Sequence, residues 1–428
     1  MKSIIFVGLA LAKWDLNKEN VVVYWGQNSY GATHPGQPWK QSLASVCQDE
    51  TIDVVNLSSL TNLSSKLPLI NLSHHCGALF AGTSVLNCTE IGKEIKGCQG
   101  KGKTVLLSIG GANAKTSLDS PRKAVMAAEN IWGMFLGGKN QLRPFGDAIL
   151  DVIDLDLEGG SQDNYDHFLK ELRQKFQVDQ QKKYYVTAAP QCFFPDANLQ
   201  RIMKENPIDA VFIQFYNNWC GVHNFNNKNA WNWNMWGAWA SGESFNKDIK
   251  LFLDVPATPK AAGFGYVSPH EVAKIVANVK ETSTHFGGVM LWDSSQNSNS
   301  GRIGERMSDV IKKSLASPSH AKVPVIKERI YGSRDNTTPR KCSSHTERKI
   351  HTIPPYTSPI NNTNPPPTTG NSTYPANGGK CDVLHACAGT NFATCDHGRW
   401  KLRPCPADLY CFKTQATVYC DRKAADPL

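Results

Sequence analysis

The chain has 428 residues, which is too long for one small domain and long enough for a large barrel or sandwich with an appended module. It carries 46 Lys and Arg residues against 37 Asp and Glu residues, a net charge of +9. No segment gathers this charge into the dense basic run of a nucleic-acid site, so we expect no nucleic-acid partner. Outside the amino terminus no stretch approaches the roughly 18 apolar residues of a membrane span, and we expect no membrane partner.

The amino terminus has the pattern of a secretory signal. Lys2 precedes an apolar run from Ile4 to Ala12 that ends in small residues. A positive residue, an apolar segment and a small-residue cleavage site are typical of signal peptides. We therefore assign residues 1–12 to a signal and expect a secreted, extracellular or cell-wall associated protein. Because the run is short, an upstream start codon and a buried amino-terminal strand stay open as alternatives.

Apolar, β-branched segments recur through residues 19–315, with helical patterns between them. The eight segments are residues 21–27, 53–60, 104–111, 148–158, 184–191, 210–216, 249–256 and 288–293. Eight strands that alternate with helices predict a (β/α)8 TIM barrel, an α/β fold whose active site lies at the carboxyl ends of the strands. Polar or aromatic side chains recur at those ends: Tyr24, Gln27, Ser108, Glu158, Gln191, Gln214, Tyr216, Asp254, Trp292 and Asp293.

The fourth of these segments contains the stretch DVIDLDLE at residues 151–158. Alternation along a strand places Asp154, Asp156 and Glu158 on one face. Crowded carboxylates repel one another, and the usual relief is that one of them stays protonated with a raised pKa, as acid catalysis requires. A polar face turned to water is the alternative, but the apolar residues before the stretch favour a central strand of a parallel sheet. Alternation alone also fits a metal site.

The thirteen cysteines indicate two disulfide-bonded domains. Six precede residue 221, six follow residue 380, and Cys342 stands between them, unpaired or paired with another chain. No paired CxxC spacing of a zinc site occurs, and we expect no metal and no cofactor. Glycosylation motifs in an exported chain begin at Asn62, Asn71, Asn87, Asn336, Asn361 and Asn371. Asn56 also fits that motif, but it lies in an apolar run and we expect it to be buried and unmodified.

Beyond the barrel the composition changes twice. Residues 316–380 are rich in Pro, Thr and Asn and predict an extended linker, because they cannot bury a core. Residues 381–421 hold six cysteines and predict a small disulfide-rich carboxyl-terminal module. Most of its aromatic residues would fill its small core, while one or two exposed ones, for which we select Trp400 and Tyr410, would stack on sugar rings.

Several motifs together resemble one enzyme family. DVIDLDLE resembles the DGxDxDxE signature of family 18 glycoside hydrolases, the chitinases, and residues 108–111 (SIGG) resemble their SxGG motif. YWGQN, AAPQC, QFYNN and LWD, which begin at residues 24, 188, 214 and 291, resemble the hevamine-like plant and fungal branch. The resemblance spans roughly residues 20–312. Val152 stands where the family has Gly, and we expect it to face away from the carboxylates and to affect local packing.

This resemblance implies a role for each carboxyl group. Glu158 would protonate the glycosidic oxygen and later act as a base. Asp156 would orient the N-acetyl group of the substrate and stabilise an oxazolinium intermediate, while Asp154 would exchange a proton or hydrogen bond with Asp156. The family is an exception to the two-carboxylate scheme, because the substrate itself supplies the nucleophile. Asp151 is interpreted as structural.

The resemblance also implies a substrate-binding wall. Tyr216 would hydrogen-bond the acetyl carbonyl, Gln214 would line the same subsite, and Trp292 would form the floor. Alternatively, Tyr216 and Gln214 cap the barrel core and Trp292 is plain packing. The remaining wall residues are Tyr24, Gly110, Gly111 and Gln191. Trp231, Trp233 and Trp236 follow the sixth strand and either line the cleft or anchor their loop, and we expect anchoring.

The same resemblance implies the disulfides Cys47–Cys98, Cys76–Cys88 and Cys192–Cys220. Residues 392–405 (FATCDHGRWKLRPC) resemble small fungal chitin-binding modules. The resulting hypothesis is a monomeric chitinase that retains anomeric configuration and acts on chitin and N-acetylglucosamine oligomers. A chitin-binding lectin and an endo-β-N-acetylglucosaminidase acting on N-glycans are the alternatives. The presence of Glu158 argues against the first, and the carboxyl-terminal module argues against the second.

Overall fold

The structure is a computed structural model that describes residues 14–37, 41–64, 66–300 and 304–317, together with the backbone of five strands between residues 385 and 421. The predicted signal peptide, Cys342 and the predicted linker beyond Ser317 lie outside the described residues. Within the described part no helix is long and apolar enough to cross a membrane.

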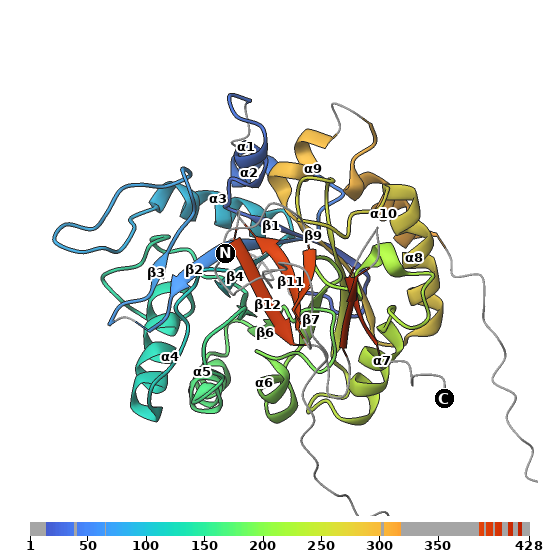
Figure 1. Cartoon of the computed structure of the whole chain (residues 1–428). Coiled ribbons are helices and arrows are strands. Elements are labelled where there is room, and N and C mark those ends of the chain that lie inside the picture. Colours follow the sequence, from blue (N-terminus) through green and yellow to red (C-terminus); the bar gives the residue numbers. More distant parts are fainter. Residues whose placement is uncertain are drawn as a thin grey trace, which may run out of the picture. The chain divides into compact units, whose positions relative to one another are not determined.

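Residues 20–292 contain a closed ring of eight parallel strands (Figure 1). In the order of the sheet, β1 pairs with β9 on one side and with β2 on the other, which closes the barrel. The predicted (β/α)8 barrel is confirmed. Its strands are β1 (Asn20–Trp25), β2 (Val54–Asn62), β4 (Thr104–Gly110), β5 (Val152–Asp156), β6 (Tyr185–Ala188), β7 (Ala210–Gln214), β8 (Lys250–Pro256) and β9 (Phe286–Trp292).

Each barrel strand differs from its predicted segment by one to four residues at one or both ends. The fourth barrel strand, β5, is shorter than the predicted segment 148–158, because the chain before it packs irregularly and Glu158 lies two residues beyond its end. A further short strand, β3 (Leu69–Ile70), pairs antiparallel with the end of β2.

Helices connect the strands around the outside of the ring (Figure 1). Two of them begin with a serine cap followed by proline: Ser120 accepts from Lys123 N and Ser268 accepts from Glu271 N, both at 3.3 Å. The helices are α1 (Ser29–Thr33), α2 (Leu43–Val46), α3 (Thr89–Gly100), α4 (Pro121–Phe135), α5 (Tyr165–Val178), α6 (Gln200–Glu205), the 3-10 helix η1 (Val222–Asn224), α7 (Trp233–Gly242), α8 (Pro269–Thr282), α9 (Ser294–Ser300) and α10 (Met307–Ala316).

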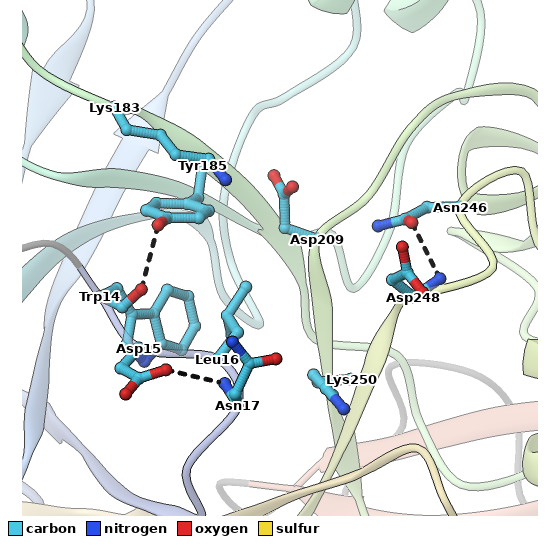
Figure 2. Close-up of a pocket in the computed structure, with 10 residues that line it drawn as sticks. All are labelled: Trp14, Asp15, Leu16, Asn17, Lys183, Tyr185, Asp209, Asn246, Asp248 and Lys250. Carbon is cyan, nitrogen blue, oxygen red and sulfur yellow. Dashed lines mark hydrogen bonds between the residues drawn. The ribbon is translucent and has the colours of Figure 1, made fainter.

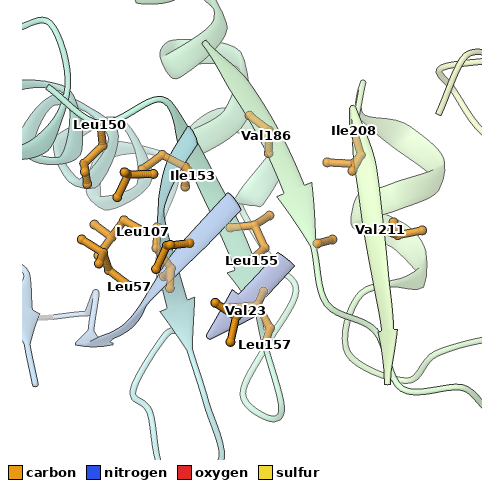
Figure 3. Close-up of a cluster of buried hydrophobic side chains, with 14 of the residues drawn as sticks. Val23, Leu57, Leu107, Leu150, Ile153, Leu155, Leu157, Val186, Ile208 and Val211 are labelled. Atoms are coloured by element: carbon orange, nitrogen blue, oxygen red, sulfur yellow. The ribbon is translucent and has the colours of Figure 1, made fainter. Parts of the chain in front are cut away.

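Alternation along the strands produces two apolar layers. One set of side chains, including Ile153 and Leu155 of β5, packs outward against the helices (Figure 3). The other set fills the interior of the barrel and includes Val152. The expectation that Val152 faces away from the carboxylates is wrong, because it lies two residues from Asp154 and shares its face.

The amino-terminal end of the barrel is closed by Trp14 (Figure 2). Its ring lies 5.7 Å from that of Tyr185 and 6.1 Å from that of Phe252, and its carbonyl oxygen accepts a hydrogen bond of 3.0 Å from the Tyr185 hydroxyl. A pocket of about 710 Å³ lies beside Trp14, and Asp209 in its wall already accepts a hydrogen bond from Val186 N. In barrels of this type the end opposite the active site generally contributes to stability.

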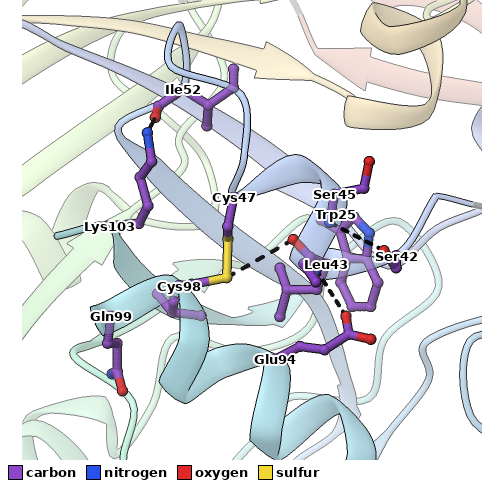
Figure 4. Close-up of a disulfide and its surroundings, with 12 residues drawn as sticks. Trp25, Ser42, Leu43, Ser45, Cys47, Ile52, Glu94, Cys98, Gln99 and Lys103 are labelled. Carbon is purple, nitrogen blue, oxygen red and sulfur yellow. Dashed lines mark hydrogen bonds between the residues drawn. A yellow bond between two sulfur atoms is a disulfide. The ribbon is translucent and has the colours of Figure 1, made fainter. Parts of the chain in front are cut away.

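The three disulfides implied by the resemblance are present: Cys47–Cys98, Cys76–Cys88 and Cys192–Cys220. The first joins α2 to α3, where Glu94 also accepts a hydrogen bond of 2.9 Å from Ala44 N (Figure 4). The third joins the segments that follow β6 and β7.

The carboxyl-terminal segment forms two small antiparallel sheets. One contains β10 (His385–Ala388), β11 (Asn391–Asp396) and β12 (Arg399–Pro404), and the other contains β13 (Tyr410–Lys413) and β14 (Val418–Asp421). Trp400 and Tyr410 belong to β12 and β13, but their side chains lie outside the described part of the structure.

Candidate active site

Three carboxyl groups follow one another at the carboxyl end of β5. Asp154 is fully buried, Asp156 is 4% exposed, and Glu158 is half-buried just beyond the strand. The three acids therefore lie in series from the interior of the barrel, at Asp154, to its mouth, at Glu158.

Asp154 is held by donors from two other strands. Asn56 Nδ2 of β2 donates to its Oδ2 at 2.8 Å, and Thr187 Oγ1 of β6 donates to its Oδ1 at 2.6 Å. Burial raises the pKa of Asp154 to about 6, against the opposing effect of these hydrogen bonds. Asn56 is buried, as predicted. The sequence did not predict the contact of Asn56 with Asp154 or that of Thr187 with Asp154.

Asp156 lies next in the series and is bound by Gln214. The Gln214 Nε2 atom donates to Asp156 Oδ1 at 3.0 Å and to the carbonyl oxygen of Ala189 at 3.1 Å. Burial raises the pKa of Asp156 well above its usual range, and the nearby carboxyls of Glu158, Asp154 and Asp254 raise it further. Asp156 therefore keeps a proton under conditions in which a solvated carboxyl would lose it.

Gly110 and Gly111 contact the backbone of Asp156. Gly110 has φ +133°, and a Cβ atom there would overlap the Asp156 carbonyl oxygen. The same oxygen accepts a hydrogen bond of 2.8 Å from Gly111 N. Glycine at position 110 allows β4 and β5 to approach closely at the strand end that carries the acids, whereas Gly111 is favoured by its own φ of +93°.

Three aromatic residues surround this end of the barrel. Tyr24 is 1% exposed, and its ring meets the partly buried Trp292 edge-on at 5.1 Å. The Tyr216 hydroxyl is hydrogen-bonded to Asp254 Oδ2 at 3.2 Å. Burial raises the pKa of both tyrosines, and neighbouring carboxyls raise it further. Both hydroxyls therefore remain protonated and can donate.

Gln191 borders the same region. Its side-chain oxygen accepts from Asn218 Nδ2 at 3.3 Å, and its backbone N donates to Asp196 Oδ2 at 3.0 Å. An isolated bridge also pairs Gln191 with Gln214. The structure thus brings together the predicted site residues on or just after five barrel strands: Tyr24 of β1, Gly110 and Gly111 of β4, Asp154, Asp156 and Glu158 of β5, Gln214 and Tyr216 of β7, and Trp292 of β9. The side chains of Trp400 and Tyr410 lie outside the described part of the structure.

The tryptophans after β7 anchor their segment, as expected. Trp233 and Trp236 are buried in α7, and Trp236 Nε1 donates to the carbonyl oxygen of Cys192 at 2.9 Å. Trp231 packs against Phe215 with ring centroids 4.8 Å apart.

Asp151 has a structural role. It accepts from Val105 N at 2.8 Å and from Gln99 Nε2 at 2.9 Å, and it forms an ion pair of 2.7 Å with Lys182. Among the residues described by the structure, no group of three or more His, Cys, Asp and Glu side chains is arranged to hold a metal ion.

The sequence of residues 20–262 matches the family model described as glycosyl hydrolases family 18. The chain belongs to this family. A family relative named Chitinase 2 from Rhizopus oligosporus is 35% identical over 414 residues, which cover 96% of this chain and 71% of the relative.

Solved structures are similar to the barrel of this chain. The chitinase ICChI from Ipomoea carnea superposes with a TM-score of 0.56 and 30% identity, over 69% of this chain and 99% of that one. The xylanase and alpha-amylase inhibitor protein XAIP-II from Scadoxus multiflorus superposes with a TM-score of 0.57 and 32% identity, over 69% and 98%. Proteins named as enzymes and as inhibitors thus share this fold, so the fold alone does not distinguish an enzyme from an inhibitor.

Proposed function

We propose that this family 18 protein is a secreted chitinase that hydrolyses β-1,4-linked N-acetylglucosamine polymers with retention of anomeric configuration. The observation that carries the proposal is the buried Asp156, held by Gln214 and placed between Asp154 and the half-buried Glu158. Such a series supplies a proton at the mouth and a hydrogen-bonding carboxyl behind it, which are the two groups that substrate assistance needs.

In the first step the acetyl carbonyl oxygen of the substrate attacks C1, and the bond from C1 to the leaving sugar breaks. Glu158 gives its proton to the departing glycosidic oxygen. Asp156 accepts a hydrogen bond from the acetamide N–H and stabilises the positive charge of the oxazolinium ring. Tyr216 donates to the acetyl oxygen and holds it in position for the attack.

In the second step a water molecule attacks C1 and opens the oxazolinium ring. Glu158, now a carboxylate, takes the proton from this water and returns to its acid form. Two inversions at C1 leave the product with the original configuration. The protein supplies no covalent nucleophile, which agrees with the depth at which Asp154 and Asp156 are buried.

The hydrogen bonds from Asn56 and Thr187 keep Asp154 oriented behind Asp156. Asp154 can then accept a hydrogen bond from Asp156 when Asp156 is protonated, or share its proton when the substrate binds. This arrangement separates the two tasks, because Glu158 exchanges protons with the substrate while the buried pair adjusts its charge.

The proposal extends to the other segments of the chain. Residues 1–12 would direct export, residues 316–380 would form a linker, and residues 381–421 would bind chitin through Trp400 and Tyr410. Tethering to an insoluble polymer raises the effective concentration of the barrel, residues 19–315, at the polymer surface.

The test compares chitin oligomers with oligomers of the same length that lack the N-acetyl groups. We expect hydrolysis of the acetylated series, with the β anomer formed first in NMR spectra, and almost no cleavage of the other series. Efficient cleavage of the acetyl-free oligomers would contradict substrate assistance. Binding without hydrolysis would favour the lectin alternative, and release of N-glycans from glycoproteins would favour the endoglycosidase.

A further inference from the structure

A fourth carboxyl group lies within the barrel mouth, outside the acid series of β5. Asp254 belongs to β8, is fully buried, and pairs in register with Gln214 of β7. Its Oδ2 atom lies 3.2 Å from the Tyr216 hydroxyl. The residue that we propose to hold the acetyl group is therefore in direct contact with a second carboxyl.

The surroundings of Asp254 favour a neutral carboxylic acid. Its Oδ1 atom is buried and has no hydrogen-bond partner among the described residues. The groups that act on its charge are the Tyr216 hydroxyl, the carboxyl of Asp154 and the backbone N–H of Val255, and none of them is a cation. An ionised carboxylate in this position would be desolvated, and the hydrogen bonds from Tyr216 and from Val255 N, which favour the charged form, compensate for this only in part. Burial accordingly raises the pKa of Asp254 well above its usual range.

Other titratable groups lie around the contact between Asp254 and Tyr216. Asp154 and Asp156 face it from β5, Tyr24 from β1, and Glu158 acts on Tyr216 from the mouth. All four are acidic. Any of them that is ionised would repel negative charge at Asp254, and none supplies a positive charge, so the neutral form is again favoured.

We propose that Asp254 is a positioning residue that stays protonated and donates its hydrogen to the Tyr216 oxygen, so that the Tyr216 hydrogen is free for the acetyl oxygen of the substrate. The inference rests on the proposed function. The direction of the hydrogen bond between Asp254 and Tyr216 determines whether the Tyr216 hydrogen is available to the substrate. An ionised Asp254 would accept the Tyr216 hydrogen and withdraw it from the substrate, whereas a neutral Asp254 polarises the phenol and strengthens it as a donor.

Two substitutions of Asp254 distinguish a carboxyl that donates to Tyr216 from one that accepts from it. Asp254→Asn keeps the shape and a hydrogen-bond donor but cannot ionise, and Asp254→Val keeps neither donor nor acceptor. Each is made with Tyr216 present and in the Tyr216→Phe background, and kcat/KM is measured on N-acetylglucosamine oligomers across the pH range. We expect Asp254→Asn to stay within about threefold of the parent and Asp254→Val to lose about tenfold or more, mainly in kcat. In the Tyr216→Phe background the two variants should agree within about twofold.

The buried Asp293 of the neighbouring strand end provides a matched control. It is 1% exposed and bonded to Ser295 and Gln296, with no hydrogen bond to Tyr216. Whatever Asp293→Asn does to kcat/KM, its effect should be the same with and without Tyr216→Phe. Loss of activity in Asp254→Asn as large as in Asp254→Val would overturn the proposal, and so would full activity in Asp254→Val.

Infrared spectroscopy tests the protonation directly and does not depend on catalysis. The carbonyl stretch of a protonated carboxylic acid should be present in the parent at neutral pH and reduced in Asp254→Asn. If the parent protein proves inactive on chitin oligomers, the proposed function fails and this band still reports on Asp254. If no such band is lost in Asp254→Asn, the proposal for Asp254 fails even in an active chitinase.

Discussion

Gln214 Nε2 donates to Asp156 Oδ1 at 3.0 Å and so connects the carboxyl end of β7 to the acids of β5. The Gln214 amide thus fixes the rotation of the Asp156 carboxyl, because a second hydrogen bond from the same amide to the Ala189 carbonyl oxygen holds Gln214 in place. The orientation of Asp156 toward a bound acetamide therefore depends on a residue two barrel strands away.

Replacement of Gln214 by Leu should disturb this orientation. The variant loses the donor to Asp156 while it keeps a similar volume, so we expect kcat on soluble chitin oligomers to fall about tenfold with a small change in thermal stability. Gln162→Leu is the control, because Gln162 donates to Ala197 O outside the acid series. Unaltered kcat in Gln214→Leu would show that Asp156 needs no such support.

Gly110→Ala should destabilise the barrel. The new methyl group would overlap the Asp156 carbonyl oxygen at a backbone φ of +133°, and we expect a loss of about 3 kcal/mol or more in the free energy of unfolding. Gly97→Ala in α3 is the matched control, because a Cβ atom added there would meet nothing within 4 Å. That variant should be about 0.5 to 1 kcal/mol more stable. Denaturant unfolding measures both, and equal stability of the two variants would contradict the close approach of β4 and β5.

Asp293 should make stability dependent on pH. Burial raises its pKa from 3.8 to about 7, so the folded state binds this proton more tightly than the unfolded state. The stabilisation is complete below the unfolded value and is lost as the pH rises through about 7. Asp293→Asn should therefore reduce the decline of the unfolding free energy between pH 4 and 7, by up to about 1.4 kcal/mol per pH unit.

The control for this experiment is Asp248→Asn, which removes an exposed carboxyl in the loop before β8. Urea unfolding at several pH values measures the slope for the parent and both variants. A slope in Asp293→Asn equal to that of the parent would show that the buried carboxyl does not carry the proton.

Deletion of residues 381–428 should weaken adsorption to insoluble chitin at least about tenfold and leave hydrolysis of soluble oligomers intact. Trp400→Ala and Tyr410→Ala in the full chain narrow the effect to the proposed contact residues. Depletion of the protein from a chitin suspension measures adsorption. If the shortened chain adsorbs as well as the full one, the segment has another role.

The barrel could be predicted because each strand is an apolar run of suitable length between helical patterns. The shared face of the acids in and just after β5 could also be predicted, because side chains alternate between the two faces along a strand. The face of Val152 was misassigned, although the same alternation places it with Asp154. The sequence predicts strand for residues 148–150 because they are apolar, but in the structure they precede β5 outside any strand, with Ala148 and Leu150 buried and Ile149 partly buried.

The contacts between strands were not predictable from one sequence. Thr187 and Asn56 meet Asp154 from opposite sides, 33 and 98 residues away along the chain, and no local pattern encodes that meeting. Asp254 was noted only as a polar residue at a strand end. Its contact with Tyr216 depends on the register of β8 against β7, which the tertiary structure sets.

The most direct test of the central claim is the hydrolysis of chitin oligomers by Glu158→Gln. The substitution keeps the size of the side chain and removes its proton transfer, so we expect turnover to fall at least about a hundredfold while oligomers still bind with parental affinity. Isothermal calorimetry and product analysis on the same preparation measure both quantities. Turnover close to that of the parent would contradict the assignment of Glu158 as the acid, and with it the proposed mechanism.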